Sequence, residues 1–420
     1  MKRNRVFGGL LYMMMLAVLG MGCGKTTQTG EVQNTYAGAV SMESTPIINY
    51  IVPQIYPNIL INQEGYLVNG DKEAAVKGKQ LPSLFHLVDI STEQVVYSGT
   101  IEDITYNEEK NLYTGLAVFT DFAKEGTYYL ECDKIGRSLP FVLQGQLYKQ
   151  QFLEMYEAAI QACEEHTAAV SDIMALLTAY EWYPSVFPDE DLDTIPDVME
   201  VIADWIAENE KVETDENHET LYVAALAKFS YLYQKFDLQY ATECLQHASA
   251  VFSKMQAPLG KDADYFYALT ELYRATGLHT YRNQIQDYAS YFQGNSSYLV
   301  EPSYLYGAMT YLITRQQVDV QLCNTFMSDI MDRGEEVSNL YEDLINPIGA
   351  KNNGVDDLLN RAQELFCCNY VLNNYEYTHI IEEFLDYLMG RNLESVCFYP
   401  EEGVKSGYLL LLSQLAATVE

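Results

Sequence analysis

The chain has 420 residues, of which 48% are hydrophobic and 13% aromatic, so it holds enough apolar material for one large or two ordinary folded domains. Its 59 acidic residues against 25 basic ones give a formal net charge of −34, spread along the sequence, and such a surface repels phosphate backbones. This argues against nucleic acid as a partner, whereas neutral polysaccharides need no positive field, because hydroxyl hydrogen bonds and aromatic stacking hold them.

Residues 1–22 have the pattern of a signal peptide. A basic start is followed by an apolar run over 6–22, which is short for a membrane-spanning helix. Cys23 ends the run, and this predicts cleavage before Cys23 and its lipidation, although Gly20 stands where a bacterial lipobox usually has leucine. The alternative is an ordinary cleaved signal. We therefore expect an exported protein, lipid-anchored on the bacterial cell membrane and facing outside the cytoplasm.

Residues 23–57 are rich in Thr, Ser, Gly and Gln, which predicts a flexible tether. Beyond it, seven cysteines remain, an odd number without CxxC or zinc spacing, and this predicts buried free thiols. These cysteines are Cys132, Cys163, Cys244, Cys323, Cys367, Cys368 and Cys397.

Residues 58–145 predict a β-sandwich. Short runs of β-branched and aromatic residues alternate with Gly, Asn and Asp turn signals, at the spacing typical of such domains. The clearest of these runs are residues 59–61, 83–88, 95–97 and 127–130.

From residue 148 to residue 420 the apolar period changes from two to about 3.6, which predicts a domain built almost entirely of helices. Successive helices with short polar connections are typical of helical hairpins or of an α/α barrel. The period is clearest at Leu221, Ala225, Phe229 and Leu232, and again at Ile380, Phe384, Leu385 and Leu388.

Two sets of segments carry a resemblance to a known family: residues 61–67, 72–76, 85–89 and 121–130 in the first predicted domain, and residues 176–184, 195–200, 222–228, 271–277 and 385–392 in the second. In this order they resemble the immunoglobulin-like domain and the catalytic domain of the family 9 glycoside hydrolases, the cellulase family in which an Ig-like domain often precedes the catalytic domain. The resemblance implies an Ig-like β-sandwich over 58–145 and a shortened (α/α)6-type barrel over 148–420.

The resemblance implies an inverting hydrolase, in which one carboxylate activates water and a second carboxylic acid protonates the leaving oxygen. The family carries its base in an Asp-Ala-Gly-Asp motif before the segment at 176–181. Between Phe152 and Leu176 this chain has no such motif, so no general base is identified. Three acidic residues lie near that position in the sequence: Glu164, Glu165 and Asp172. They are weak candidates for a substitute base, because a base must first be correctly placed and only then needs a suitable pKa.

Glu402 is the candidate general acid, because it stands in the string Glu-Glu-Gly-Val, where the family has its glutamate near the C-terminus. The alternative is a solvated acidic turn. The His and Arg that help the family grip its sugar have no counterpart after Asn392.

A weak calcium candidate lies within the part of the chain that resembles the catalytic domain. Asp189, Asp191, Asp193 and Glu200 fit part of a calcium-loop spacing, but Thr194 replaces the glycine that the sharp turn needs. We interpret the stretch as an acidic loop that caps a helix, and we expect no cofactor.

Without a base motif, the sequence predicts a non-catalytic surface protein that binds a β-glucan-type polysaccharide or an envelope protein. A divergent β-glucan hydrolase with recruited carboxylates is the alternative, and a two-carboxyl cleft would favour it. A third hypothesis, a purely structural assembly component, predicts a large exposed apolar patch.

Overall fold

The computed structural model describes most of the chain after its first 56 residues. None of the helices in this described part is both long enough and apolar enough to cross a membrane. The predicted signal peptide, Cys23 and Glu402 lie outside the described residues. Those residues are 57–209, 219–255, 257–258, 260–293, 296–345, 354–399 and 405–419.

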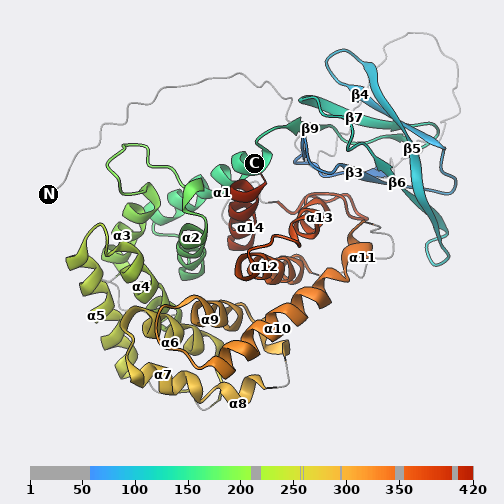
Figure 1. Ribbon diagram of the computed structural model, residues 1–420. Helices are drawn as coiled ribbons and strands as arrows, with labels where there is room; N and C mark the ends of the chain where they lie inside the picture. Colours follow the sequence, from blue (N-terminus) through green and yellow to red (C-terminus); the bar gives the residue numbers. More distant parts are fainter. Residues whose placement is uncertain are drawn as a thin grey trace, which may run out of the picture. The chain divides into compact units, whose positions relative to one another are not determined.

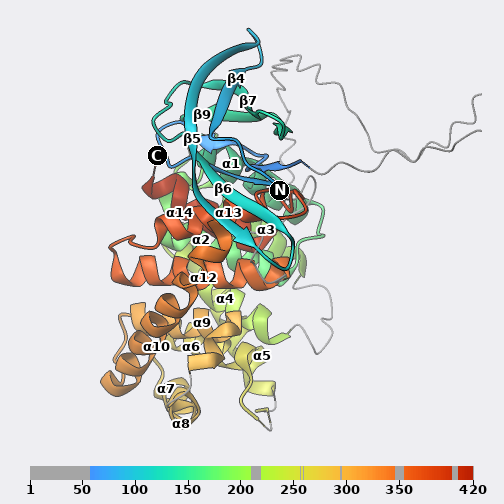
Figure 2. The same ribbon diagram turned by 90° about the vertical axis from the view of Figure 1, so that its right-hand side faces the viewer.

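The β domain contains nine strands in the order β1-β3-β6-β5-β4-β7-β9-β2, with β8 paired to β7. Its long strand β5 (Gln94–Asn107) pairs with β4 through its first half and with β6 through its second half, and so joins two sheets. Figures 1 and 2 show this strand from two sides. The other strands are β1 (Ile59–Leu60), β2 (Tyr66–Leu67), β3 (Glu73–Gly78), β4 (Leu84–Asp89), β6 (Leu112–Val118), β7 (Gly126–Cys132), β8 (Gly136–Arg137) and β9 (Phe141–Gln144).

Alternate residues of these strands form the core of the β domain. Phe85 and Leu87 on β4 are fully buried, as is Leu130 on the neighbouring β7. Tyr66 meets Phe119 and Phe141 edge to face, at centroid distances of 5.3 and 5.4 Å. Burial of each such side chain contributes about 1.5–3 kcal/mol, so this face fixes the strand register. The predicted β-sandwich is confirmed.

The rest of the described chain is helical. It contains twelve helices of eight or more residues, the short helices α8 (Ala289–Phe292) and α11 (Tyr341–Ile345), and two 3-10 turns. The twelve are α1 (Leu147–Glu164), α2 (Val170–Trp182), α3 (Asp197–Asn209), α4 (Glu219–Tyr233), α5 (Leu238–Lys254), α6 (Ala263–Thr276), α7 (His279–Gln286), α9 (Pro302–Ile313), α10 (Val320–Ser338), α12 (Val355–Leu372), α13 (Thr378–Leu388) and α14 (Ser406–Thr418).

Six of these helices form a closed inner ring, in which α2, α4, α6, α9, α12 and α14 each pack on the next and α14 returns to α2. The inner helices are buried almost all round, as eight consecutive residues of α9 from Tyr304 to Tyr311 illustrate. An outer helix such as α5 buries one stripe only, at Ala241, Cys244, Ala248 and Phe252. The predicted (α/α)6 barrel is confirmed.

No disulfide joins the seven cysteines of the described chain to one another, and five of them are buried. Burial raises the pKa of the Cys132, Cys163 and Cys368 thiols to about 12. Thiols with such pKa values stay protonated at neutral pH and react slowly. The prediction of buried free thiols is therefore confirmed at these positions.

The β domain meets the barrel at segments that carry the family resemblance. Asn62 Nδ2 donates to Asp386 Oδ1 at 2.7 Å, and the Gln63 N–H donates to the Met389 carbonyl at 2.8 Å. Gly390 has φ +125°, a conformation that strains any residue with a Cβ, and a Cβ there would also displace the Gln63 side chain, whose Nε2 would lie 2.4 Å away. Fully buried Arg391 pairs with Glu383 and lies 3.5 Å from Asp386 Oδ2.

A cavity of about 160 Å³ at this joint is lined mainly by carboxylates and tyrosines. Burial raises the pKa of Asp386 well above its usual value, and nearby Glu382 and Glu73 raise it further. Burial also raises the pKa values of Glu382 and Glu73 themselves. The folded protein therefore binds protons here more tightly than the unfolded chain, and its stability decreases as pH rises through these raised pKa values.

We predict that Glu382→Gln raises the melting temperature at pH 7.5 and reduces the loss of stability between mildly acidic and neutral pH. Glutamine mimics the protonated acid and still accepts the Tyr148 hydroxyl, which donates to Glu382 Oε1 at 2.8 Å. Thermal unfolding across pH 5–8 measures this effect. The matched control is Glu157→Gln, an exposed position on α1. A lower melting temperature than wild type at pH 7.5 would contradict the prediction.

Candidate ligand-binding site

A cavity of about 340 Å³ opens among the N-terminal halves of the inner helices. All six inner helices line it, so the cavity lies within the inner ring. On α2 and α12 the lining residues recur at i, i+3, i+4 and i+7, the spacing of one helix face. The lining consists of Ser171, Met174, Ala175, Thr178, Leu221, Tyr267, Pro302, Ser303, Tyr306, Asp356, Leu359, Asn360, Gln363, Lys405, Ser406, Gly407 and Leu410.

The walls are mostly apolar and carry a few polar groups. Gln363 is buried, and its Oε1 accepts the Tyr306 hydroxyl at 2.7 Å, which holds both side chains in place. Exposed Asp356 and half-buried Lys405 stand in or next to the first turns of neighbouring inner helices. Apolar walls with a few fixed polar groups are typical of sites that bind small organic ligands.

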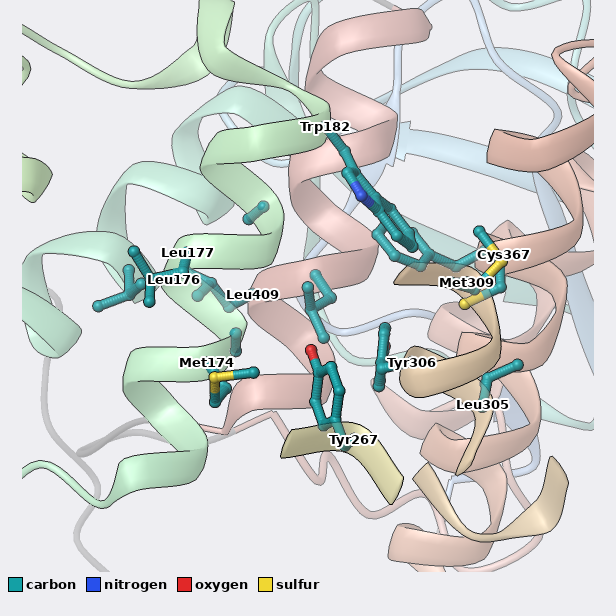
Figure 3. Packing of buried hydrophobic residues seen from close by; sticks show 14 of the residues in the cluster. Met174, Leu176, Leu177, Trp182, Tyr267, Leu305, Tyr306, Met309, Cys367 and Leu409 are labelled. Atoms are coloured by element: carbon teal, nitrogen blue, oxygen red, sulfur yellow. The ribbon is translucent and has the colours of Figure 1, made fainter. Parts of the chain in front are cut away.

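Aromatic side chains close the inner end of the cavity. Tyr267 and Tyr306 stack at 6.3 Å, and Trp182 contacts Tyr306 at 6.2 Å and lies flat on Tyr370 at 4.1 Å. Figure 3 shows Tyr267, Tyr306 and Trp182 in the space between the helices. All three side chains are at most 8% exposed. Phe366 stacks on Trp182, and we call Tyr267, Tyr306, Trp182 and Phe366 the aromatic floor.

Beyond the aromatic floor, a charged cluster joins the C-terminal halves of three inner helices. Lys228 Nζ of α4 lies 2.5 Å from Glu181 Oε2 of α2 and 3.4 Å from Glu271 Oε1 of α6. Arg274 also pairs with Glu181, and the Tyr231 hydroxyl donates to Glu271 Oε2 at 2.9 Å. Burial alone would raise the pKa of Glu181, but Lys228 and Arg274 outweigh it and hold that pKa below its usual value.

We predict that Glu181→Ala destabilises the protein by roughly 3–5 kcal/mol at pH 7, because it leaves Lys228 and Arg274 without their shared buried carboxylate. Because the folded pKa of Glu181 is lowered, its contribution is present above the ordinary glutamate pKa and is lost as pH falls through the folded value. The difference between wild type and variant should therefore shrink below about pH 4.

Urea denaturation at pH 7 and at acidic pH measures this difference. Glu165→Ala, at an exposed position after α1, is the control and should have little effect. A change of less than about 1 kcal/mol at pH 7 for Glu181→Ala would contradict the account of the cluster.

The acidic residues considered as substitute bases have different surroundings. Asp172 Oδ2 accepts the Ala169 N–H at 3.0 Å, and its Oδ1 accepts the Ser406 hydroxyl at 2.6 Å. Both carboxylate oxygens of Asp172 therefore accept hydrogen bonds that stabilise the start of α2 and connect it to α14. Glu164 and Glu165 are exposed and do not line the cavity. Among the described residues, Asp356 is the one carboxylate that lines it.

Glu402, the candidate acid, lies outside the described residues, and its role stays a prediction. In sequence it stands three positions before Lys405, a residue of the cavity wall. No general base was identified from the sequence, and within the described segments the cavity adds Asp356 as the one new carboxylate.

The structure brings the acidic loop residues together as the calcium template suggested. Ligand atoms of Asp189, Asp191 and Asp197 lie within 4.8 Å of one another, as do those of Asp191, Asp193 and Glu200. Several of these carboxylates also accept backbone N–H groups in the loop: Asp193 Oδ1 accepts that of Ile195 at 2.8 Å, and Asp189 Oδ2 that of Thr194 at 3.2 Å. These bonds agree with a loop that stabilises its own turn and the start of α3.

We predict that neither EDTA nor millimolar Ca²⁺ shifts the melting temperature by more than about 2 °C, because the loop carboxylates already have backbone donors. Thermal unfolding of the chelated protein, with and without added CaCl₂, measures this. A calcium-dependent rise that Asp193→Asn abolishes would show instead that the loop is a cation site.

Sequence reasoning did not identify Tyr267, Tyr306 and Gln363. With 35 tyrosines in the chain, abundance alone conceals which of them face the barrel interior. Gln363 carried a usable signal, because it is a polar side chain within the run 362–369 that α12 buries completely. A buried amide needs partners, so it marks a polar site inside the ring.

The fold and the cavity define a class of protein: a β-sandwich followed by an (α/α)6 barrel with a cavity within its inner ring. Residues 207–406 match the family described as "Glycosyl hydrolase family 9", and residues 54–137 match the "Cellulase N-terminal ig-like domain". Most of the helical domain is therefore similar to glycosyl hydrolase family 9, and the domain before it is similar to the Ig-like domain that the sequence predicted.

Solved structures agree with this assignment. A metagenome-derived glycoside hydrolase family 9 endoglucanase matches with a TM-score of 0.65 and 19% identity over 81% of this chain and 84% of that chain. A thermostable endoglucanase from Alicyclobacillus acidocaldarius matches at 0.60 and 17%, over 82% and 85%. A Bacteroides ovatus GH9 protein matches at 0.61 and 13%, over 81% and 85%. At these identities the likeness establishes the fold. A comparison with curated protein sequences gave no match.

Proposed function

We propose that the protein is a non-catalytic polysaccharide-binding protein of the bacterial cell envelope, anchored by lipid on Cys23, and that its cavity binds sugar units of a β-glucan-type chain. The observation that carries the proposal is the lining of the cavity. Inverting hydrolysis needs two facing carboxyl groups about 6.5–9.5 Å apart. Among the described residues the cavity wall offers one, Asp356, and it is exposed.

The remaining lining supports sugar binding. A pyranose presents apolar C–H faces and a rim of hydroxyl groups, so it is bound by aromatic or aliphatic surfaces beside fixed hydrogen-bonding groups. The cavity combines Tyr267 and Tyr306 with the Gln363 and Asn360 amides and several hydroxyl side chains. Because Gln363 already holds the Tyr306 hydroxyl, this part of the site is ordered before a ligand arrives.

The choice of a β-glucan ligand rests on the relatives. Two similar solved structures are endoglucanases, and a third similar structure is of AaCel9A in complex with cellobiose-like isofagomine. For this chain the ligand class is therefore a proposal drawn from shared fold and family.

Hydrolysis through Glu402 is the second candidate. The observation that favours it is the position of Glu402 in the sequence, three residues before Lys405 of the cavity wall. A partner in the envelope in place of a glycan is the third candidate. One set of measurements separates these outcomes.

We predict that the purified full chain binds soluble β-glucan by calorimetry and releases no reducing sugar from β-glucans or xylan. Gln363→Leu should weaken binding about tenfold or more, because it removes a polar contact and leaves the Tyr306 hydroxyl without its acceptor. Gln239→Leu, an exposed glutamine on α5, is the matched control.

Sugar release by the wild type that Glu402→Gln abolishes would overturn the non-catalytic proposal and would identify the acid. Absence of both binding and release by a folded protein would overturn the glycan proposal and would favour an envelope partner.

A further inference from the structure

We propose that the cavity is a well for chain ends, which takes the terminal one or two sugar rings of a glycan and excludes the interior of a long chain. This inference rests on the proposed glycan-binding function and adds to it the part of the polymer that is recognised. Three features of the cavity carry it: its enclosure, its depth and its closed inner end.

The enclosure comes from the inner ring. Lining residues lie on all six inner helices, from Ser171 on α2 through Leu221, Tyr267, Ser303 and Asn360 to Ser406 on α14. These helices pack on one another around a closed ring. The cavity is therefore surrounded by helices over the depth that its lining residues span, so a sugar chain that fills this depth enters it end-on from the mouth.

The depth follows from the lining of two helices. On α2 the lining runs from Ser171 to Thr178, and on α12 from Asp356 to Gln363. Seven residues of α-helix rise about 10 Å, which is close to the length of a disaccharide. The volume of about 340 Å³ lies near the lower limit of small-molecule sites. One or two sugar rings fit a space of this length and volume.

The inner end offers no exit for a chain. Tyr267 and Tyr306 are buried and stacked there, with Trp182 and Phe366 behind them. Behind this aromatic floor, Lys228 and Glu271 are 1% and 0% exposed and belong to the charged cluster. A sugar chain that enters between the helix N-termini must therefore stop at the floor.

The test asks whether binding follows the number of chain ends or the total mass of the polymer. The full chain is titrated by calorimetry with cellotriose and with a soluble β-glucan, before and after limited shortening of that polymer by acid. We expect cellotriose to bind and to compete with the polymer. We also expect the amount of protein bound per gram of polymer to rise in proportion to the number of chain ends.

Two substitutions that reduce the free volume locate the site. Ala175→Leu adds bulk to the α2 wall, and Ser171→Phe adds it at the exposed first turn, where folding is least at risk. Both should weaken cellotriose and polymer binding about tenfold or more. Ala250→Leu, an exposed alanine on α5, is the control. Should either variant fail to fold, the competition between cellotriose and the polymer for the wild-type protein still tests the proposal.

Polymer binding per gram that does not change on shortening would overturn the chain-end proposal while glycan binding stands. Binding that Ser171→Phe leaves intact would also overturn it, because the ligand would then lie elsewhere. No binding of either ligand would overturn glycan binding itself, so the two failures are distinguishable.

Discussion

Closure of six inner helices around their own side chains is the constraint on which the rest of the structure depends. Helices that are apolar on nearly every face need a second layer, and the outer helices, with single apolar stripes, supply it. Inside the ring, the aromatic floor and the charged cluster that contains Lys228 fill its middle and one end. What is left open is the cavity at the helix N-termini. The site is therefore the part of the barrel interior that packing does not fill.

The joint between the domains depends on a second set of interior charges. Asn62, Asp386 and Arg391 lie in the two segments that most clearly mark the family, and they interact although more than 300 residues separate the first from the others. Gly390 lies against the Gln63 side chain at this joint, and its φ of +125° favours glycine over any residue with a Cβ. The segments that resemble the family here meet in the packing between the two domains.

The sequence predicted the fold because its signals are local and periodic: alternation before residue 145, a 3.6-residue period after it, and short motifs in family order. The binding site was harder to predict. Tyr306 and Gln363 are brought together from α9 and α12, 57 positions apart, and nothing in either segment indicates the other. Asp172 shows the opposite case. Its position in the sequence made it a possible substitute for the catalytic base, whereas its contacts with Ala169 and Ser406 are those of a residue that stabilises the start of a helix.

The most direct test of the central claim is a crystal structure of the protein soaked with cellotriose. The account predicts an intact trisaccharide whose innermost ring lies against Tyr306 and within hydrogen-bonding distance of Gln363, with the other end leaving between the helix N-termini. Cleaved sugar in the cavity, with Glu402 and a second carboxylate on opposite sides of the broken linkage, would contradict it. So would an intact ligand bound on the β domain with the cavity left empty.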